Sequence, residues 1–443
     1  MMKRSYYFLI IAFLGVIIFF NSCNKEEDLI TGQKTEFVDT TIIDDSIYYF
    51  IDGLMREWYL WNELLPDEID VLSYAYPQDL LDALKVSIDK WSFVDKQQSV
   101  SDFFDEGKDF GFGFFLGWDG NPALSSTNLR VIFCYNNTSA YQTGIRRGNI
   151  ISEINDISVK NIASFDPFFS SDAGSMKFKF IDNDSINQSV TLTKESYSMN
   201  AVLFSDTYKI DNKIIGYIVL QSFLRFSEEE IDTVFSSLAS DGVTELIVDL
   251  RFNGGGYVDI AENLAGKIIS KSKVGNVFFK YNHNKLRQAE FDTTVYFKES
   301  KDNLNLSRVF FITNSSSASA SELVINGLSP HMGVHVIGDS TSGKPVSMYG
   351  FTFQDWVVYP VVAKSTNANG YGDYFDGLPP DKKAPDFFKY DWGDDDDPAL
   401  EQAFYYIQNG TYDETITTVK AANMPSVISK GAPFKYNFLI FDN

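Results

Sequence analysis

Strands and helices alternate through the second half of the chain, and this alternation constrains its fold more than any other feature. Apolar runs at Ile214–Leu220, Glu245–Leu250 and Arg308–Thr313 predict buried strands. Helical spacing of apolar residues follows, and it predicts helices at Ser227–Ala239, Val258–Ser270 and about Ala320–Leu328, with another strand at Val334–Ile337. Such alternation is typical of a layered α/β domain, which we place at residues 198–409.

The region before this domain reads as helical and then as β-rich. Apolar residues recur at i+3 and i+4 over 44–65, where Pro66 closes the predicted helix, and a second helix is expected at Pro77–Ile88. We therefore predict a helical N-terminal region at 41–104. Short alternating runs separated by Gly and Asn-Asp turns predict a β-rich domain at 105–197. The chain is thus a multidomain α+β protein.

The remaining segments are less regular. Residues 275–300 read as a hairpin insertion, and 410–443 form a C-terminal extension that could hold late strands such as Tyr436–Ile440. The four aspartates at 394–397 could attract Ca²⁺, but they lack the spacing of an EF-hand. A solvated acidic loop before Pro398 is the expected structure.

The first 22 residues read as an export signal. Lys3 and Arg4 precede an uncharged run of 15 residues, which suits a signal peptide and is short for a membrane span. Ser22 and Cys23 follow this run, and the arrangement resembles a bacterial lipobox, in which the cysteine is lipidated. That resemblance implies a lipid anchor at Cys23, a flexible leash over 23–40, and an outer-membrane lipoprotein in the envelope of a Gram-negative bacterium, facing the periplasm or the outside. An ordinary cleaved signal peptide with an incidental cysteine is the alternative.

Composition excludes several classes of function. Two cysteines cannot make a disulfide scaffold or a Cys-rich zinc site, and three histidines limit His-based metal catalysis. The net charge of −23 repels phosphate backbones, so nucleic acid is an unexpected partner. No metal or cofactor is predicted. Cys134 lies in a strand-like run and is expected to be a buried, inert thiol.

Two polar clusters follow buried strands, where α/β proteins place their chemistry. The first is the triple glycine at 254–256, after the Asp249-Leu-Arg251 run. Its backbone N–H groups can converge on an oxyanion or a phosphate, although glycines also serve tight turns.

The second cluster is the serine-rich segment 314–322. Ser319 and Glu322 have the spacing of a capping box, which would satisfy the amides at the start of a helix. Alternatively, Ser319 is a nucleophile, since a helix N-terminus stabilises negative charge developing on a substrate carbonyl. On this segment alone, both interpretations stay open.

A serine nucleophile needs a base, and the sequence offers two kinds. His331 and His335 are candidates, but neither lies in a recognisable motif and no G-x-S-x-G elbow is present. Lys344 is the other candidate: burial in a cleft would lower the pKa of its amine enough for it to accept a proton. The alternative interpretation is that Lys344 is a lysine of a surface loop.

These motifs together resemble those of the tail-specific, or C-terminal processing, serine proteases. The resemblance rests on the run Ser-Ala-Ser-Ala-Ser-Glu at 317–322, on Gly343-Lys344, on the Asp249 run with its glycines, and on 369–381, in the family's order. It covers about residues 51–409 and implies a ClpP/crotonase-like layering of the α/β domain. Lys344 lies 25 positions after Ser319, as in the family, so the resemblance assigns the nucleophile to Ser319 and the base to Lys344. It also implies an oxyanion hole from the amides of Gly254 or Gly255 and of Ala320.

The chain departs from the family's pattern at two positions. Many members have Gln four residues after the lysine and Asp eleven residues after the serine, where this chain has Met348 and Pro330. The residue that orients the lysine is therefore open, and Glu322 or Ser347 could substitute.

The β-rich region resembles a PDZ domain through its Gly144, Gly148-Asn149 and Asn155 pattern. In that family an extended peptide adds a strand beside a glycine-containing loop, whose amides hold the peptide carboxylate. The matching loop here is Phe110-Gly111-Phe112-Gly113. A tight turn is the simpler interpretation of the loop, and a dinucleotide fingerprint is excluded by Leu116.

The sequence therefore predicts a lipid-anchored serine endopeptidase with a Ser319/Lys344 dyad, whose PDZ captures protein C-termini or gates the site. A second hypothesis is an inactive, PDZ-containing peptide-binding scaffold, and a third is a glycan-binding surface lipoprotein, suggested by the 16% aromatic content. The oligomeric state is not predicted.

Overall fold

The computed structural model describes residues 43–170, 172–415 and 425–428. The chain divides into a unit Met1–Ile43 and a unit Asp44–Asn443, and every element below belongs to the second. The predicted leader, Cys23, the leash and the strand expected at 436–440 lie outside the described residues. Among the helices of the described ranges, none is long and apolar enough for a membrane span.

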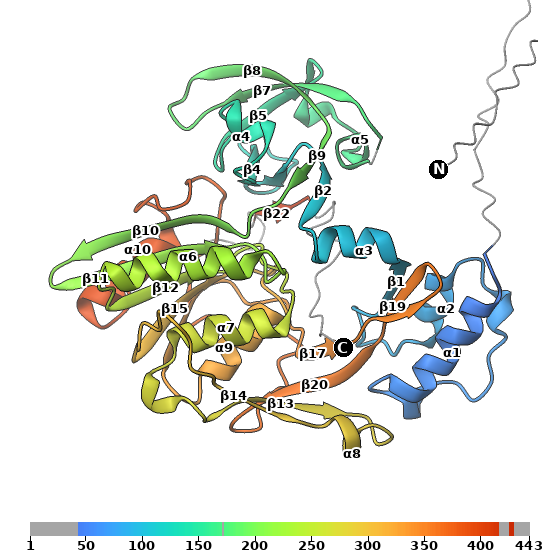
Figure 1. Cartoon of the computed structure of the whole chain (residues 1–443). Coiled ribbons are helices and arrows are strands. Elements are labelled where there is room, and N and C mark those ends of the chain that lie inside the picture. The colour runs from blue at the N-terminus through green and yellow to red at the C-terminus, as the bar shows by residue number, and fades with distance from the viewer. Residues whose placement is uncertain (1–42, 171, 416–424, 429–443) are drawn as a thin grey trace, which may run out of the picture. The chain divides into compact units, whose positions relative to one another are not determined.

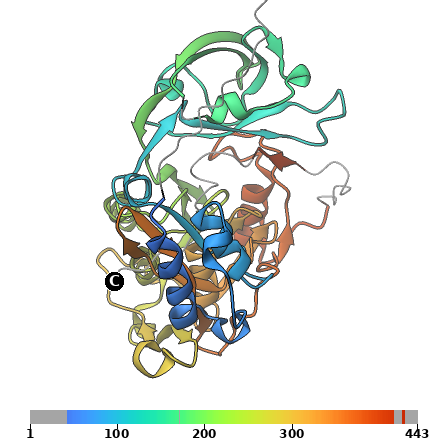
Figure 2. The same cartoon turned by 90° about the vertical axis from the view of Figure 1, so that its right-hand side faces the viewer.

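The N-terminal region consists of helices and one strand that pairs with a distant hairpin. Its elements are α1 (Ser46–Trp58), α2 (Pro77–Leu84), β1 (Phe93–Lys96) and α3 (Gln97–Phe104), with 3₁₀ turns at Asn62–Leu64 and Val71–Ser73. Strand β1 pairs antiparallel with β19 (Trp356–Tyr359), which pairs with β18 (Phe351–Phe353). In Figures 1 and 2 the blue helices accordingly lie beside this orange hairpin.

Both helices predicted here end earlier than their apolar spacing indicates. The first was expected to reach Leu65 but ends at Trp58, because Tyr59 is extended and the Leu60 N–H donates to the Val361 carbonyl at 2.8 Å. The second was expected to reach Ile88 but ends at Leu84, and the Val86 N–H donates to the Tyr59 hydroxyl at 3.1 Å. Tertiary hydrogen bonds therefore override helical spacing at both ends.

The β-rich domain is one twisted sheet with short helices. Its elements are β2 (Lys108–Gly111), β3 (Phe114–Trp118), β4 (Leu129–Cys134), α4 (Ser139–Gln142), β5 (Ile150–Ile154), β6 (Ile157–Ser158), a 3₁₀ turn (Val159–Asn161), α5 (Asp166–Phe169), β7 (Ser175–Ile181), β8 (Asn187–Thr193) and β9 (Glu195–Ser198). The sheet order is β22-β3-β4-β5-β7-β8, and β2 pairs with β9 separately. Strand β22 (Ser426–Val427) is a segment of the C-terminal extension that the sequence did not predict.

The α/β domain contains a six-stranded sheet of order β10-β11-β12-β15-β16-β21. Only the β10–β11 pair is antiparallel. The strands are β10 (Val202–Ile210), β11 (Lys213–Leu220), β12 (Glu245–Asp249), β15 (Arg308–Thr313), β16 (Gly333–Gly338) and β21 (Lys382–Lys383). The helices are α6 (Ser227–Ser240), α7 (Val258–Ile268), α9 (Ala320–Leu328) and α10 (Pro398–Asn409). Helix α7 packs against α6 and α9, whereas α10 packs on β15 and β16 (Figure 1).

A second sheet of the same domain has the order β14-β13-β20-β17. It contains the predicted hairpin insertion, and its strands are β13 (Val277–His283), β14 (Thr294–Tyr296), β17 (Val346–Met348) and β20 (Val361–Asn367). Helix α8 (Gln288–Phe291) joins β13 to β14, and a 3₁₀ turn at Lys271–Lys273 follows α7. Strand β17 begins two residues after Lys344, so this sheet supports the lysine-bearing loop.

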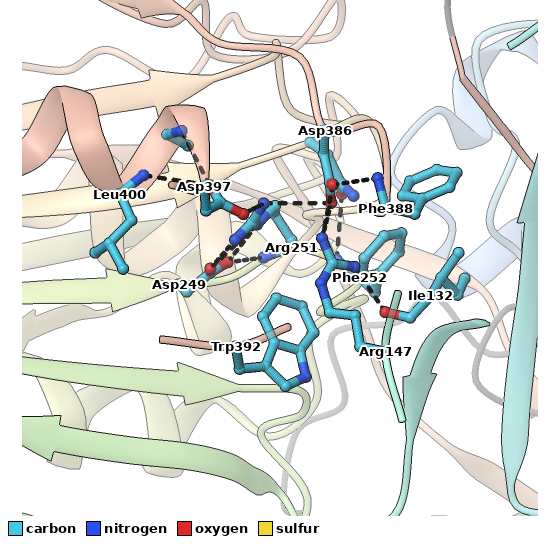
Figure 3. A network of polar contacts seen from close by, with 12 residues as sticks. Ile132, Arg147, Asp249, Arg251, Phe252, Asp386, Phe388, Trp392, Asp397 and Leu400 are labelled. Carbon is cyan, nitrogen blue, oxygen red and sulfur yellow. Dashed lines mark hydrogen bonds and ion pairs between the residues drawn. The ribbon is translucent and has the colours of Figure 1, made fainter. Parts of the chain in front are cut away.

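A buried ionic network fixes the end of β12, as Figure 3 shows. The Arg251 guanidinium binds the carboxylates of Asp249 at 2.6 Å, Asp397 at 2.9 Å and Asp386 at 3.3 Å. Asp386 also binds Arg147 of the β-rich domain at 2.6 Å. Asp397 was predicted to lie in a solvated acidic loop, and this is wrong: its carboxylate is buried, pairs with Arg251 and accepts the amides that begin α10.

Replacing Asp397 by Ala should lower the free energy of unfolding by about 3 kcal/mol, because it removes one partner of a buried guanidinium and a helix cap. The exposed Asp395 of the same acidic run is the matched control, and Asp395→Ala should change that free energy by less than about 0.5 kcal/mol. Urea denaturation of both variants measures the difference. Equal stability of the two variants would contradict the structural role of Asp397.

Candidate active site

Ser319 lies at a sharp turn between a buried strand and a helix. Strand β15 ends at Thr313, and α9 begins at Ala320 directly after Ser319. Ser319 has φ 64°, a left-handed conformation that costs a non-glycine residue about 1–3 kcal/mol. The surrounding loop holds it there: the Ser317 hydroxyl donates to the Leu250 carbonyl at 2.8 Å, and the Ala318 N–H donates to the Asn253 carbonyl at 3.0 Å.

The Ser319 hydroxyl is not used to cap the helix. Its Oγ is buried and has no hydrogen-bond partner among the described residues. The predicted capping box is confirmed in its arrangement: the Ser319 side chain lies at the N3 amide without a hydrogen bond to it, and the Ser319 backbone N–H donates to Glu322 Oε2 at 2.8 Å. A buried hydroxyl without a partner is costly, so it needs an explanation other than helix stability. Availability for chemistry is such an explanation.

Glu322 links two loops by hydrogen bonds. One is the serine loop, which lies between β15 and α9 and contains Ser319, and the other is the lysine loop, which lies between β16 and β17 and contains Lys344. Its Oε2 accepts the N–H groups of Ser319 and Lys344, each at 2.8 Å, so the two nitrogens lie no more than twice that distance apart. Its Oε1 accepts the Thr341 hydroxyl at 2.6 Å and the Gly343 N–H at 2.7 Å. Burial raises the pKa of the carboxyl, while these four hydrogen bonds favour its charged form.

Lys344 is buried, with 1% of its surface exposed. Burial holds the pKa of its ammonium well below the usual range, and the nearby carboxylates of Asp89 and Glu322 only partly oppose this shift. Asp89 was not predicted, and it comes from the N-terminal region, where it accepts the N–H groups of Trp91 and Ser92 at 2.9 Å each. A lysine in this setting can carry a neutral amine.

The segment 369–381, which is one of the parts on which the family resemblance rests, holds the lysine loop. The Leu378 N–H donates to the Thr341 hydroxyl at 2.7 Å, and the Thr341 N–H donates to the Leu378 carbonyl at 3.1 Å. Gly343 has φ +87°, and a Cβ there would lie 2.3 Å from the Phe375 carbonyl oxygen. The glycine before Lys344 is thus required by close backbone packing.

The glycine loop, which is the triple glycine at 254–256, lies against the serine loop. A Cβ on Gly255 would lie 2.7 Å from Ser319 Cβ and 3.0 Å from the Ala320 nitrogen. The Gly255 N–H is engaged, since it donates to Asn253 Oδ1 at 2.9 Å. Within the described ranges, the N–H groups of Gly254 and Ala320 make no hydrogen bond. Of the two glycines, Gly254 therefore has the amide available to an oxyanion.

The other candidate residues lie elsewhere. The Ser347 hydroxyl contacts the Ser365 hydroxyl at 3.1 Å. The ring of His331 contacts the Val277 carbonyl at 2.8 Å, and His335 stacks on Phe310 in the middle of the sheet, so neither histidine is placed beside Ser319. Cys134 is confirmed as a buried thiol, and burial raises its pKa to about 12.

The two departures from the family pattern differ in their setting. Met348 is fully buried in β17, where an apolar side chain suits its surroundings. Pro330 follows the end of α9, about 15 Å along the helix from Ser319. Position 330 therefore lies beyond the end of α9 that is opposite Ser319.

The predicted peptide-binding loop contains both buried and exposed side chains. The ring of Phe112 packs in the core of the β-rich domain, whereas Phe110 is 39% exposed. Gly113 has φ +76°, and a Cβ there would lie 2.3 Å from the Thr138 side chain. The amides of Phe112 and Gly113 make no hydrogen bond in the part of the chain that is described.

Family models match two parts of the chain. Residues 214–384 match Peptidase family S41, and residues 46–93 match the Peptidase S41 N-terminal domain. These two parts of the chain therefore resemble peptidase family S41. The resemblance to C-terminal processing serine proteases is thereby confirmed at the level of the family.

Curated relatives support the same family. A "Probable CtpA-like serine protease" of Staphylococcus aureus (strain COL) is 27% identical over 290 residues, which cover 65% of this chain and 54% of the relative. One of Staphylococcus saprophyticus is 22% identical and covers 70% of this chain and 60% of the relative. The chain thus spans about half the length of the curated relatives it matches.

A solved structure supports the mixed α/β fold. A protein of Bacteroides fragilis NCTC 9343, assigned to the S41 proteases, superposes with a TM-score of 0.69 at 20% identity. The alignment covers 82% of this chain and 97% of that one.

The lowered pKa of Lys344 predicts a pH dependence of stability. In the unfolded chain the pKa is near 10.5, so unfolding takes up a proton between the lowered pKa and 10.5, and the free energy of unfolding rises with pH in that window. Lys344→Met removes this dependence, so the variant should be more stable than the wild type at pH 7, by a margin that shrinks toward pH 10. Urea denaturation across this range measures the margin. The exposed Lys209 is the control, and Lys209→Met should keep the wild-type trend.

Proposed function

We propose that this chain is a serine endopeptidase in which Ser319 is the nucleophile and Lys344 the general base. The observation that carries the proposal is the Glu322 carboxylate, which binds the backbone amides of both residues at 2.8 Å. The unused Ser319 hydroxyl and the lowered pKa of Lys344 support the same roles.

In the proposed mechanism, the neutral amine of Lys344 takes the proton of the Ser319 hydroxyl. The Ser319 oxygen attacks a peptide carbonyl, and the resulting oxyanion is held by the free amides of Gly254 and Ala320. The Lys344 ammonium then protonates the leaving amine, which breaks the peptide bond and leaves an acyl-enzyme. Water, deprotonated by Lys344, hydrolyses the ester and regenerates Ser319. Glu322 positions both loops and does not touch the substrate.

We further propose that the β-rich domain is a PDZ domain that recognises the C-termini of protein substrates. The free amides of Phe112 and Gly113 support this role, because they could hold a terminal carboxylate beside the exposed edge of the loop. The α/β domain is proposed to share the ClpP/crotonase-like layering.

A second candidate function is an inactive peptide-binding scaffold. It is favoured by the burial of Ser319 and Lys344, which are 0% and 1% exposed, so the hydroxyl is closed to substrates in this conformation. Met348, in place of the family's glutamine, points the same way.

Fluorophosphonate labelling distinguishes the two functions. The wild type should react at Ser319, and its rate should rise with pH through the lowered pKa of Lys344, because only the neutral amine accepts a proton. Ser319→Ala, Lys344→Ala and Lys344→Arg should each lower labelling and peptide hydrolysis by about 10³-fold or more. The exposed Ser315 of the same serine run is the control, and Ser315→Ala should retain the wild-type rate. A wild type that is never labelled would favour the scaffold.

We also propose that the chain is anchored by a lipid at Cys23 in the outer membrane of a Gram-negative bacterium, with its domains in the periplasm or outside. In a Gram-negative host, the wild type should incorporate labelled palmitate and sediment with membranes. Cys23→Ser should lose the label and move to the soluble fraction, whereas Cys134→Ser should change neither. Unlabelled wild type would contradict the anchor.

A further inference from the structure

The edge of β3 is occupied by the chain's own C-terminal extension. Strand β22 pairs antiparallel with β3, so that Ser426 lies opposite Trp118 and Val427 opposite Gly117. The Ile428 N–H donates to the Leu116 carbonyl at 3.0 Å, and the Ile428 side chain packs on the core of the β-rich domain. Without this segment β3 would be an edge strand with unpaired backbone groups, which readily accept another strand.

The direction of β22 is the one that a C-terminal peptide would take. Residue numbers in β22 rise as its partners in β3 fall from Trp118 to Leu116, so the segment runs toward the loop at Phe112 and Gly113. The free amides of that loop lie just before β3 begins at Phe114. A peptide in this register and direction would bring its carboxylate toward donors that are unused in the described structure.

The same segment also faces the loop that carries the nucleophile. Pro425, Ser426 and Val427 line a cavity of about 280 Å³ together with Asn314, Ser315 and Ser316. Ser316 precedes Ser319 by three residues, which limits the distance between their Cα atoms to about 11 Å. The tail therefore lies between the edge of β3 and the loop that leads to Ser319.

Few backbone contacts join the tail to β3, and so few contacts suit a ligand that can be displaced. Two residue pairs and the Ile428 hydrogen bond join it to β3, and Ser426 is exposed while Val427 and Ile428 are only partly buried. Its location within the same chain compensates for this weakness, because a tethered ligand acts at an effective concentration of about 1 mM.

We propose that the edge of β3 is an acceptor for the C-terminal segment of peptide substrates, and that residues 425–428 are its resident internal competitor. The substrate part of this proposal rests on the proposed peptidase function. Occupancy by the tail lowers the affinity for incoming peptides, and displacement of the tail opens the path from β3 to the cavity beside Ser316.

The test measures binding of a probe with the tail's own sequence. The probe is a fluorescein-labelled peptide Met-Pro-Ser-Val-Ile with a free carboxylate, and fluorescence anisotropy follows its binding to the full chain carrying Ser319→Ala. Adding Ile428→Pro removes the N–H that donates to Leu116, and it should tighten probe binding about tenfold for a tail held at about 1 mM with an intrinsic affinity of about 0.1 mM. Ile428→Val keeps the donor and should stay within about twofold of the parent.

A second variant guards against local misfolding. A chain that ends at Thr415 lacks the tail, and it should bind the probe as tightly as the Ile428→Pro variant does. Equal affinity in all four proteins, or no binding to any, would overturn the proposal, and so would an amidated probe that binds as tightly as the free acid. Because every protein carries Ser319→Ala, the result does not depend on turnover, and fluorophosphonate labelling tests the peptidase function separately.

Discussion

The geometry of the site depends on one buried carboxylate. Glu322 accepts hydrogen bonds from the backbone of Ser319, Gly343 and Lys344 and from the Thr341 hydroxyl. These donors come from two loops that are separated along the chain by α9 and β16. A carboxylate with four donors is a rigid junction, because each lost bond would leave a buried charge less compensated. The serine and the lysine are therefore positioned through their backbone amides.

Much of the α/β domain could be predicted from its sequence because its signals are local. The helix expected at about Ala320–Leu328 is confirmed as α9, and β11, β12, β15 and β16 agree with the predicted runs to within a residue or two. The spacing of 25 residues between Ser319 and Lys344 led to the prediction of a dyad, and the structure shows that Glu322 accepts a hydrogen bond from the backbone N–H of each residue. Buried strands and helix starts carry their information within a few residues, so no long-range contact was needed.

The features that the sequence did not reveal depend on contacts between distant residues. The shortened helix α1 ends where Leu60 binds Val361, and Asp397 is buried because Arg251 lies across from it. Asp89 reaches the surroundings of Lys344 from the N-terminal region, and β22 joins a sheet that lies some 300 residues earlier in the chain. From the local sequence, all four aspartates are expected to be solvated. Asp397 differs from the other three because it pairs with Arg251, a residue distant in the sequence. The peptidase roles of the site stay predictions until labelling tests them.

Arg147 and Arg251 share the carboxylate of Asp386, and these ion pairs couple the β-rich domain to the α/β domain. Arg147 belongs to the β-rich domain, whereas Arg251 lies two residues after the end of β12 and precedes the glycine loop by three residues. A rotation of the β-rich domain that withdraws Arg147 would leave Arg251 as the one arginine of this network bound to Asp386, and the guanidinium of Arg251 would then redistribute its bonds among its three carboxylates. The ion pairs that Arg251 makes just before the glycine loop would in this way depend on the position of the β-rich domain.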